Sequence, residues 1–430
     1  MNNSIKLLLT AVATSALCAC TPPSHNGITH QSSSIIKLNA QEVKNNPSLS
    51  SKQKAEELAR IGEQLFTPTG FMYAQTLFNQ ALQLDPHNLL AQFYKNLNGI
   101  NMTLRGMMVR IKPMIVTPKD RANYKNVLAH VPNSALKTFL FDGTPNIRDS
   151  KDVQAYADNL YAALERLREF LSAHKNSHLT LDLNDWTLWT GIHRAKEKCI
   201  ASKVGDTGSY SLTNCDYTHA LQVNLNRADF EGMQQIVAGE EIYFAALNSY
   251  NLTGSIRTSR KFQNQNVSDA VIYRELSKYP EFATLRTPIY LRHIEKLGVD
   301  AIAAIRWAKS LQNKLCSTGT PNPNNRPGYL FDSGFCIGEK TADGRSVNGI
   351  LKTAELILAG VPYSVLVNNV YPTVITPTKY LNNPIVDLKK LDPVFNSCGL
   401  IQRVSDVTLG GIFPDHDANK VLSITSKCQY

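Results

Sequence analysis

Two acidic pairs have the residue type that general acid and base catalysis requires, but their spacing argues against that role. Glu240 and Glu241 are adjacent, so on a helix their side chains would diverge by about 100 degrees. Asp182 precedes the helix expected at 185–198, and Asp185 at the start of that helix is more simply a cap or a first-turn charge. We therefore expect structural roles for both pairs and predict no catalytic residue.

Asp415, Asp417 and Asn419 have the one-three-five spacing of the oxygen ligands in an EF-hand calcium loop. Lys420 stands where that loop needs glycine, and Ser426 stands where it needs a bidentate glutamate. A polar surface turn is the interpretation that we favour. The sequence thus predicts no metal and no other cofactor.

Trp186, Trp189 and His193 would share one face of a short helix, because they are three and four residues apart. Such a face could form an aromatic shelf for a ligand with His193 at its edge. Tryptophans three residues apart more often pack in a core or at its rim, which is the interpretation that we prefer.

Motifs of the common enzyme classes are missing or incomplete. The stretch SKQK at 51–54 fits the SxxK pattern of penicillin-binding enzymes, but its SDN and KTG partners are absent. No nucleophile elbow, HExxH, Walker loop or Rossmann glycine fingerprint occurs in a matching context. We therefore expect a protein that is not an enzyme.

A run of basic residues interleaved with methionines is the strongest charge feature. Pro113 and Pro118 interrupt it, so the bases cannot form one continuous helical stripe. The run could lie against anionic lipid or a flexible partner, although a solvated face over an ordinary core is the simpler interpretation. Its members are Arg105, Arg110, Lys112, Lys119, Arg121 and Lys125.

The composition is that of a globular protein. The 430 residues suffice for one large or two ordinary domains, and 43% of them are hydrophobic and 19% charged. A formal net charge of +10 favours acidic surroundings, such as anionic lipid, polysaccharide or an acidic protein. Nucleic acid is also acidic, but the start of the chain resembles an export signal and so argues against the cytoplasm, where nucleic acid is found.

The first twenty residues, MNNSIKLLLTAVATSALCAC, have the features of an export signal. Lys6 precedes an apolar stretch that is too short to span a bilayer. The stretch LCAC at 17–20 resembles the processing box of bacterial lipoproteins, whose last cysteine becomes the lipidated first residue. This resemblance implies a signal peptide at 1–19, lipid on Cys20 and, with Thr21 next, an outer-membrane location facing the periplasm or the cell surface. A plain secretory signal is the alternative.

Six further cysteines are expected to form disulfides in an exported chain. Neighbouring cysteines are the favoured partners, because each intervening loop is polar and short enough to close easily. A metal site lacks the CxxC or Cys/His cluster that it would need. The predicted pairs are Cys199 with Cys215, Cys316 with Cys336, and Cys398 with Cys428.

Apolar periodicity predicts a mostly α-helical chain. It divides into the signal peptide at 1–19, a flexible tether at 20–50, a helical body at 51–315 and a disulfide-stapled C-terminal region at 316–430. That last region is expected to contain loops and a short strand pair within 363–376. Helices are expected at 51–66, 73–85, 88–109, 150–175, 185–198, 226–249, 268–277, 288–315 and 345–358.

The stretch 55–88 resembles one tetratricopeptide (TPR) unit and has that family's length of 34 residues. Leu58 and Leu65 replace the usual tryptophan and tyrosine. The matching residues are Ile61 and Gly62 in the first helix, Ala74, Phe78 and Ala81 in the second, and Pro86 after the exit turn. A single unit cannot bury its own apolar face, so the following helices are expected to pack on it.

The TPR resemblance implies a binding function. The first helix of such a unit lines the concave side, so we expect Glu56, Ala59, Arg60, Glu63 and Phe66 to face a partner. The predicted function is a noncatalytic, lipid-anchored envelope scaffold or adaptor that binds a protein or peptide, and not nucleic acid. A solute-binding or transport-accessory lipoprotein with a small ligand between helices is the alternative. An envelope hydrolase whose site is assembled from distant residues is a third possibility.

Overall fold

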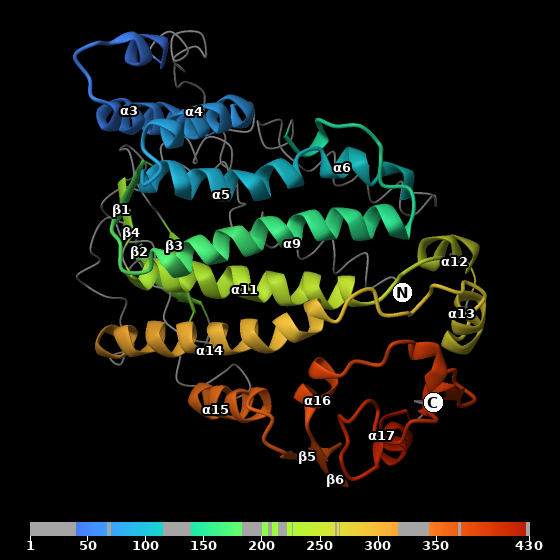
Figure 1. Ribbon diagram of the computed structural model, residues 1–430. Helices are drawn as coiled ribbons and strands as arrows, with labels where there is room; N and C mark the ends of the chain where they lie inside the picture. The colour runs from blue at the N-terminus through green and yellow to red at the C-terminus, as the bar shows by residue number, and fades with distance from the viewer. Residues whose placement is uncertain are drawn as a thin grey trace.

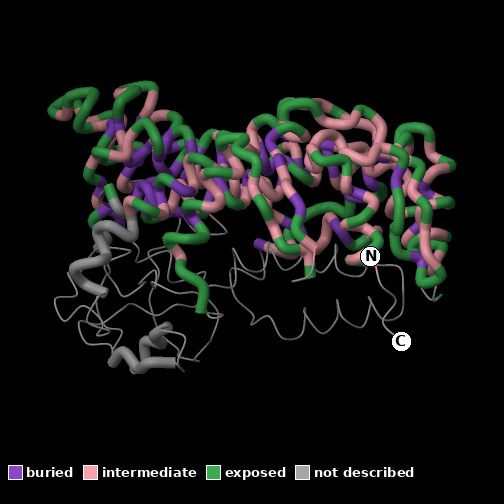
Figure 2. The backbone as a smooth tube through the Cα atoms, turned by 90° about the horizontal axis from the view of Figure 1, so that it is seen from below, coloured by how far each residue is buried: buried purple, intermediate pink, exposed green. Residues whose placement is uncertain are grey.

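The computed structural model describes residues 40–66, 70–114, 139–182, 200–204, 209–213, 222–225, 227–262, 265, 267–316, 344–368 and 371–426. These residues are mostly helical, as the sequence predicts. Figure 1 shows helices α3, α4, α5, α9, α11, α14 and α15 lying in successive layers, which we call the helical stack. Buried positions recur along these helices, with exposed positions between them (Figure 2).

The stack begins with α3 (Ser51–Gln64), α4 (Phe71–Leu84) and α5 (Leu89–Leu104). Local signals fix these helices. Ser50 and Gln53 form a capping box at the start of α3, in which each side chain accepts a hydrogen bond from the backbone N–H of the other. Pro86 follows the end of α4, and the side chain of Asn88 accepts from the Ala91 N–H to cap α5.

Close packing of α3 on α4 depends on Gly62. A Cβ placed on Gly62 would lie 2.5 Å from the ring of Phe78, so no larger residue fits without movement. Phe78 in turn stacks on Tyr94 of α5, with the ring centroids 5.4 Å apart. Offset aromatic pairs of this kind add about 1 kcal/mol beyond the area that they bury. The first three helices thus share one aromatic core.

The single helix expected over 88–109 is divided in two. After α5, Gly106 adopts a φ of +67°, and α6 (Met107–Arg110) and the 3₁₀ turn η1 (Lys112–Met114) follow. A Cβ on Gly106 would lie 2.5 Å from the carbonyl oxygen of Asp142, and a Cβ on Gly143 would lie 3.0 Å from the Gly106 Cα. The helix ends because another part of the chain crosses it at this point.

Three long helices form the middle of the stack: α9 (Ser150–Ala173), α11 (Arg227–Ser249) and α14 (Ile289–Cys316). Asp149 caps α9 by accepting from the backbone N–H groups of Lys151 and Asp152. Asp229 lies in the first turn of α11, where a negative charge suits the helix dipole.

Two antiparallel strand pairs lie in the region after α9, and the sequence did not predict them. Strand β1 (Leu179–Asp182) pairs with β4 (Gln222–Leu225), and β2 (Ile200–Val204) pairs with β3 (Ser209–Thr213). Leu179 and Leu181 are buried, so β1 directs alternate side chains into the core. This strand reaches α3, where the Arg60 guanidinium donates to the carbonyl oxygen of Thr180.

The elements after residue 360 lie at the other end of the stack from α3, and α12 and α13 lie beside the ends of the long middle helices (Figure 1). The strand pair predicted over 363–376 is present as β5 (Tyr363–Val367) and β6 (Tyr371–Ile375). The turn-rich end carries a short helix that the sequence did not predict, α17 (Ala418–Thr425). The other elements are α12 (Ser255–Phe262), α13 (Asp269–Leu276), α15 (Val347–Leu358), α16 (Pro377–Asn382), η3 (Leu388–Leu391), β7 (Val394–Phe395) and β8 (Ile401–Arg403).

Part of the segment predicted as a flexible tether is helical. Residues 40–45 are helical, and Ala40 is fully buried against the hydrophobic core. The Lys54 ammonium donates to the carbonyl oxygen of Lys44 at 3.0 Å, which fastens this helix to α3. The packed body therefore starts before Ser51. The predicted signal peptide and Cys20 lie outside the described residues.

The predicted disulfides fall largely outside the described residues. Cys398 is disulfide-bonded, and Cys316 ends α14. Cys199, Cys215, Cys336 and Cys428 are not described, so the three pairings stay predictions. One contact favours the last of them: the side chain of Asn396 donates to the carbonyl oxygen of Ser426, which places the chain just before Cys428 beside Cys398.

Candidate binding sites

The five residues of α3 that the sequence predicts to face a partner divide into two sets. Glu56 is exposed and Arg60 is partly exposed, whereas Ala59 and Phe66 are fully buried and Glu63 is 1% exposed. Phe66 packs in the aromatic core, with its ring centroid 4.8 Å from that of Tyr94. The expectation that all five line an open groove must be corrected, because Ala59, Glu63 and Phe66 are inaccessible in this structure.

Strand β1 covers the charged part of this face. The Glu63 carboxylate accepts hydrogen bonds from the Tyr94 hydroxyl at 2.8 Å, the Asp182 N–H at 2.8 Å and the Arg60 guanidinium at 2.9 Å. Arg60 also donates to the carbonyl oxygen of Thr180 at 3.0 Å. The backbone of β1 therefore covers the polar part of this face, where the sequence predicted that a partner would bind.

Burial raises the pKa of the Glu63 carboxyl, and its three hydrogen bonds act in the opposite direction by favouring the charged form. Burial and the neighbouring Glu63 also raise the pKa of Tyr94. Every donor around Glu63 is engaged within the protein. This cluster joins α3, α5 and β1, which is a structural role.

A cleft of about 480 Å³ remains open beside the exposed part of α3. It lies between the start of α3 and the turn that joins α4 to α5, and residues of both charges line it, including Lys52, Glu56, Asp85 and His87. The Glu56 carboxylate accepts from the Asn88 side chain at 3.0 Å and lies 3.3 Å from the Arg60 guanidinium. Glu56, one of the predicted contact residues, is therefore both accessible and held in place.

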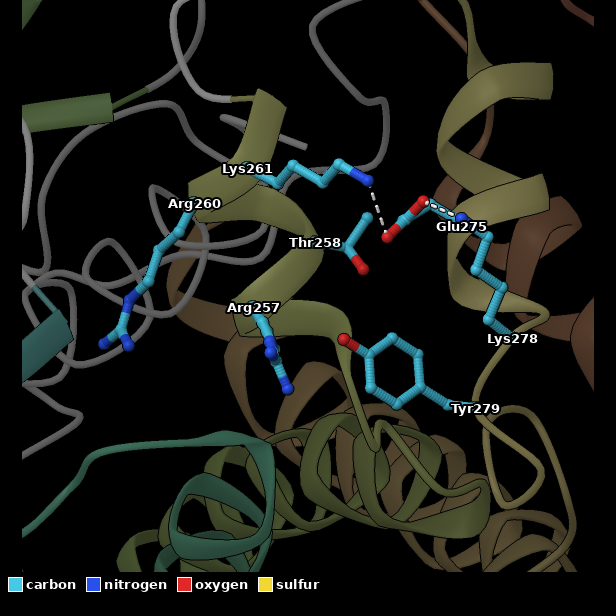
Figure 3. Close-up of a pocket in the computed structure, with 7 residues that line it drawn as sticks. All are labelled: Arg257, Thr258, Arg260, Lys261, Glu275, Lys278 and Tyr279. Atoms are coloured by element: carbon cyan, nitrogen blue, oxygen red, sulfur yellow. Dashed lines mark hydrogen bonds and ion pairs between the residues drawn. The ribbon is translucent and has the colours of Figure 1, made fainter.

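A second cleft, of about 620 Å³, lies between α12 and α13 (Figure 3). Glu275 of α13 spans it, with its carboxylate oxygens 2.9 Å from the Lys261 ammonium of α12 and 2.7 Å from the Lys278 ammonium. The hydrogen bonds from Lys278 and then Lys261 lower the pKa of Glu275. The other residues that line the cleft are Arg257, Thr258, Arg260 and Tyr279.

Backbone geometry and distant contacts hold the α12–α13 cleft together. Gly254 precedes α12 with a φ of +83°, and the ring of Tyr279 occupies the space that a Cβ on Gly254 would take. The Arg260 guanidinium donates to the carbonyl oxygens of Pro113 at 2.8 Å and Arg148 at 3.2 Å. These contacts fasten α12 to two other segments of the chain.

Two polar groups of this cleft have no partner within the described residues. Thr258 is 1% exposed, yet its hydroxyl makes no hydrogen bond there. Arg257 is exposed and takes part in no hydrogen bond or ion pair with the residues that the structure describes. This site was not predicted from the sequence, although the run RTSRK at 257–261 is a signal of locally concentrated positive charge.

Of the two acidic pairs, Glu240 and Glu241 lie within the described residues, on α11. Glu241 has no exposed surface and accepts from the Arg168 guanidinium at 2.8 Å, and Asp300 lies 3.8 Å from the same guanidinium. Burial raises the pKa of Glu241 to about 7, against the opposing attraction of Arg168. Burial also raises the pKa of Glu240. Asp185 lies outside the described residues.

The calcium-like triplet does not form a cluster of metal ligands. Asp415 is exposed, and Asp417 accepts from the Thr373 hydroxyl. The Asn419 amide both accepts from the N–H of Val404 at 2.8 Å and donates to its carbonyl oxygen at 3.1 Å. Within the described residues no group of three or more His, Cys, Asp and Glu side chains could hold a metal ion.

The basic run is divided among separate contacts where the structure describes it. Arg105 pairs with Asp142, and Arg110 donates to the Asn146 side chain at 3.0 Å. Lys112 is exposed in η1. The other predicted candidates lie outside the described residues: Lys119, Arg121 and Lys125 of this run, and Trp186, Trp189 and His193 of the aromatic face.

Comparison of this chain with known protein families, with characterised proteins and with solved structures found no match. The described helices include none that is both long and apolar enough to cross a bilayer. Functional inference therefore depends on the two clefts themselves.

Proposed function

We propose that this protein is a noncatalytic scaffold or adaptor, anchored by lipid on Cys20 in the bacterial cell envelope, which binds a partner protein or peptide beside α3. The α3–α4 pair carries the proposal. Gly62 lies against Phe78 at its crossing, Ala74 and Ala81 are fully buried in it, and Pro86 follows it. These are the positions at which the sequence resembles a TPR unit, and the packing of α5 on the pair supports that resemblance.

The open cleft at the start of α3 is the surface proposed for the partner. Since Ala59, Glu63 and Phe66 are enclosed, Glu56 and Arg60 are the predicted contact residues that a partner can reach. Side chains of both charges line the cleft, which suits a protein or peptide that itself carries both charges. The surface is too open to isolate a reaction from water, which favours binding over catalysis.

Site-specific crosslinking tests this proposal in the full-length chain. A photo-crosslinking residue at position 56 should capture one discrete envelope protein or peptide in living cells. The matched control is position 57, because Glu57 is exposed on the same helix but does not line the cleft. A charge reversal at Lys52, which also lines the cleft, should weaken the capture. Equal capture from both positions, or none from position 56, would contradict the proposal.

Lipid attachment is tested separately. Cells fed an alkyne fatty acid should label the wild-type chain, and the label should be absent from the Cys20→Ser variant. That variant should also leave the membrane fraction, because several acyl chains on one residue are needed for stable anchoring. Labelling of the Cys20→Ser variant would contradict the proposed lipid attachment at Cys20 but would leave the proposed partner site untouched.

The alternative function, binding of a small solute, has one observation in its favour. The α12–α13 cleft has a volume within the range of small-molecule sites, and cations line it.

A further inference from the structure

We propose that the cleft between α12 and α13 binds a phosphate-bearing small molecule. This inference goes beyond the scaffold function and does not depend on it, because the cleft and the proposed partner surface have no lining residue in common. Three features support it: an excess of positive charge, a buried hydroxyl without a partner, and a second hydroxyl on the same lining.

The positive charge of the cleft exceeds what its one carboxylate can neutralise. Arg260 extends away from Thr258 and Glu275 in Figure 3, and it is engaged by two backbone carbonyls. Arg257, Lys261 and Lys278 remain against Glu275, so three cations face one anion. An anionic ligand would supply the missing charge, and the planar guanidinium of Arg257 can donate to two of its oxygens at once.

The Thr258 hydroxyl points to a ligand that accepts hydrogen bonds. A threonine inside a helix commonly donates to the carbonyl oxygen four residues earlier, which here is that of Gly254. That oxygen accepts from the backbone N–H of Thr258 at 2.8 Å, but the hydroxyl donates to no described residue. A buried hydroxyl without a partner is destabilising, and a bound oxygen atom would relieve this cost.

The mixture of donors favours phosphate over carboxylate. A phosphate monoester offers three strong acceptor oxygens in a tetrahedral arrangement, whereas a carboxylate offers two oxygens in a plane. The cleft lining combines a guanidinium, two ammonium groups and the hydroxyls of Thr258 and Tyr279. Proteins commonly hold phosphate with this set of arginine, lysine, threonine and tyrosine donors. The cleft is larger than one phosphate group, so the ligand has further atoms.

Isothermal titration calorimetry on the full-length chain provides the test, with pyrophosphate as the probe and citrate as the carboxylate comparison. Pyrophosphate should bind saturably with one site per chain, more tightly than citrate, and should bind more weakly as NaCl is raised. Arg257→Gln and Thr258→Val should each raise the Kd by about tenfold or more, because each loses a hydrogen bond to a charged group.

Two control variants distinguish a specific site from general attraction to a basic protein. Arg274→Gln removes an exposed cation of α13 that does not line the cleft, and its Kd should stay within about twofold of the wild-type value. Thr258→Ser keeps the hydroxyl and should bind almost as well as the wild type. The Thr258→Val variant should have an unchanged or higher melting temperature, because it removes an unpaired buried hydroxyl.

Four outcomes would overturn the proposal. They are the absence of saturable pyrophosphate binding, tighter binding of citrate, wild-type affinity in Thr258→Val, and equal loss of affinity in Arg274→Gln and Arg257→Gln. None of these outcomes bears on the crosslinking at position 56, so the two proposals can fail independently.

Discussion

The charged side chains of the helical stack and those of the α12–α13 cleft have opposite surroundings. In the stack, Glu63 is 1% exposed and receives three hydrogen bonds, one of them from the backbone of a strand more than a hundred residues away. In the cleft, the Lys278 side chain is 65% exposed and shares a single carboxylate with Lys261. Charges that are enclosed with their partners within the chain build the fold, whereas charges left in excess are available to a ligand. Substitutions of charged residues in the stack should therefore change stability, whereas those in the cleft should change ligand binding.

The largest loss of stability is expected when one partner of the buried ion pair between Arg168 and Glu241 is removed. Arg168→Met leaves the Glu241 carboxylate enclosed without its cation, and it should lower the free energy of unfolding by about 3–5 kcal/mol at pH 8. The double variant Arg168→Met/Glu241→Met should recover most of that loss, because similar apolar side chains need no partner. Urea denaturation measures both. A single variant within about 1 kcal/mol of the wild type would show that the pair is not matched as we describe.

The pH dependence of stability provides a second test of how Glu241 is enclosed. Burial raises the folded-state pKa of Glu241 to about 7, above its unfolded value, so the folded chain holds this proton more tightly. The resulting stabilisation is fully present below the unfolded pKa and is lost as the pH rises through about 7. Unfolding free energy should therefore fall by about 2–3 kcal/mol between pH 5 and pH 8, and Glu241→Gln should remove most of this slope. An unchanged slope in the variant would assign the effect to other groups.

A smaller effect is expected where the stack meets β1. Glu63→Gln keeps one acceptor oxygen but weakens the hydrogen bonds from Tyr94, Asp182 and Arg60, which should cost about 2 kcal/mol in urea denaturation. Glu57→Gln is the matched control on the same helix, and because Glu57 is exposed it should cost less than about 0.5 kcal/mol. Equal effects would mean that β1 does not depend on Glu63 for its position.

The smallest effect on stability is expected in the cleft. Arg257→Gln should change the free energy of unfolding by less than about 0.5 kcal/mol, because Arg257 is exposed and has no partner within the described residues. The same variant should nevertheless bind pyrophosphate more weakly, with a Kd raised by about tenfold or more. If it destabilised the chain as much as Glu63→Gln does, the contrast between enclosed and available charge would fail.

Helices with their own boundary signals could be predicted from the sequence. The capping box at Ser50, the break at Pro86 and the cap at Asn88 act within a few residues, so α3 and α4 agree closely with expectation. The end of α5 could not be predicted, because it depends on contact between Gly106 and a chain segment more than thirty residues away. Strands β1 and β4 have four residues each, which is too short for a clear alternating pattern.

The candidate sites could be predicted from the sequence only in part, because their accessibility depends on contacts between distant residues. The TPR resemblance placed five residues of α3 on one face, but sequence position does not show that Phe66 enters the aromatic core or that β1 covers Glu63. The α12–α13 cleft requires Lys261 and Lys278 to meet at Glu275 across a turn. Local spacing indicates where charge is dense, but the availability of that charge depends on contacts that only the fold brings together.

The crossing of Gly106, just after α5, with the segment that holds Gly143 joins two distant parts of the chain. The Gly106 N–H donates to the Phe139 carbonyl oxygen at 2.8 Å, and the Ile147 N–H donates to that of Arg110 at 2.9 Å. These two hydrogen bonds connect the segment that ends at residue 114 directly to the segment that begins at residue 139. Cleavage of the folded chain between those positions should therefore leave two pieces that stay associated, because these bonds and the packing of α5 on α9 connect them.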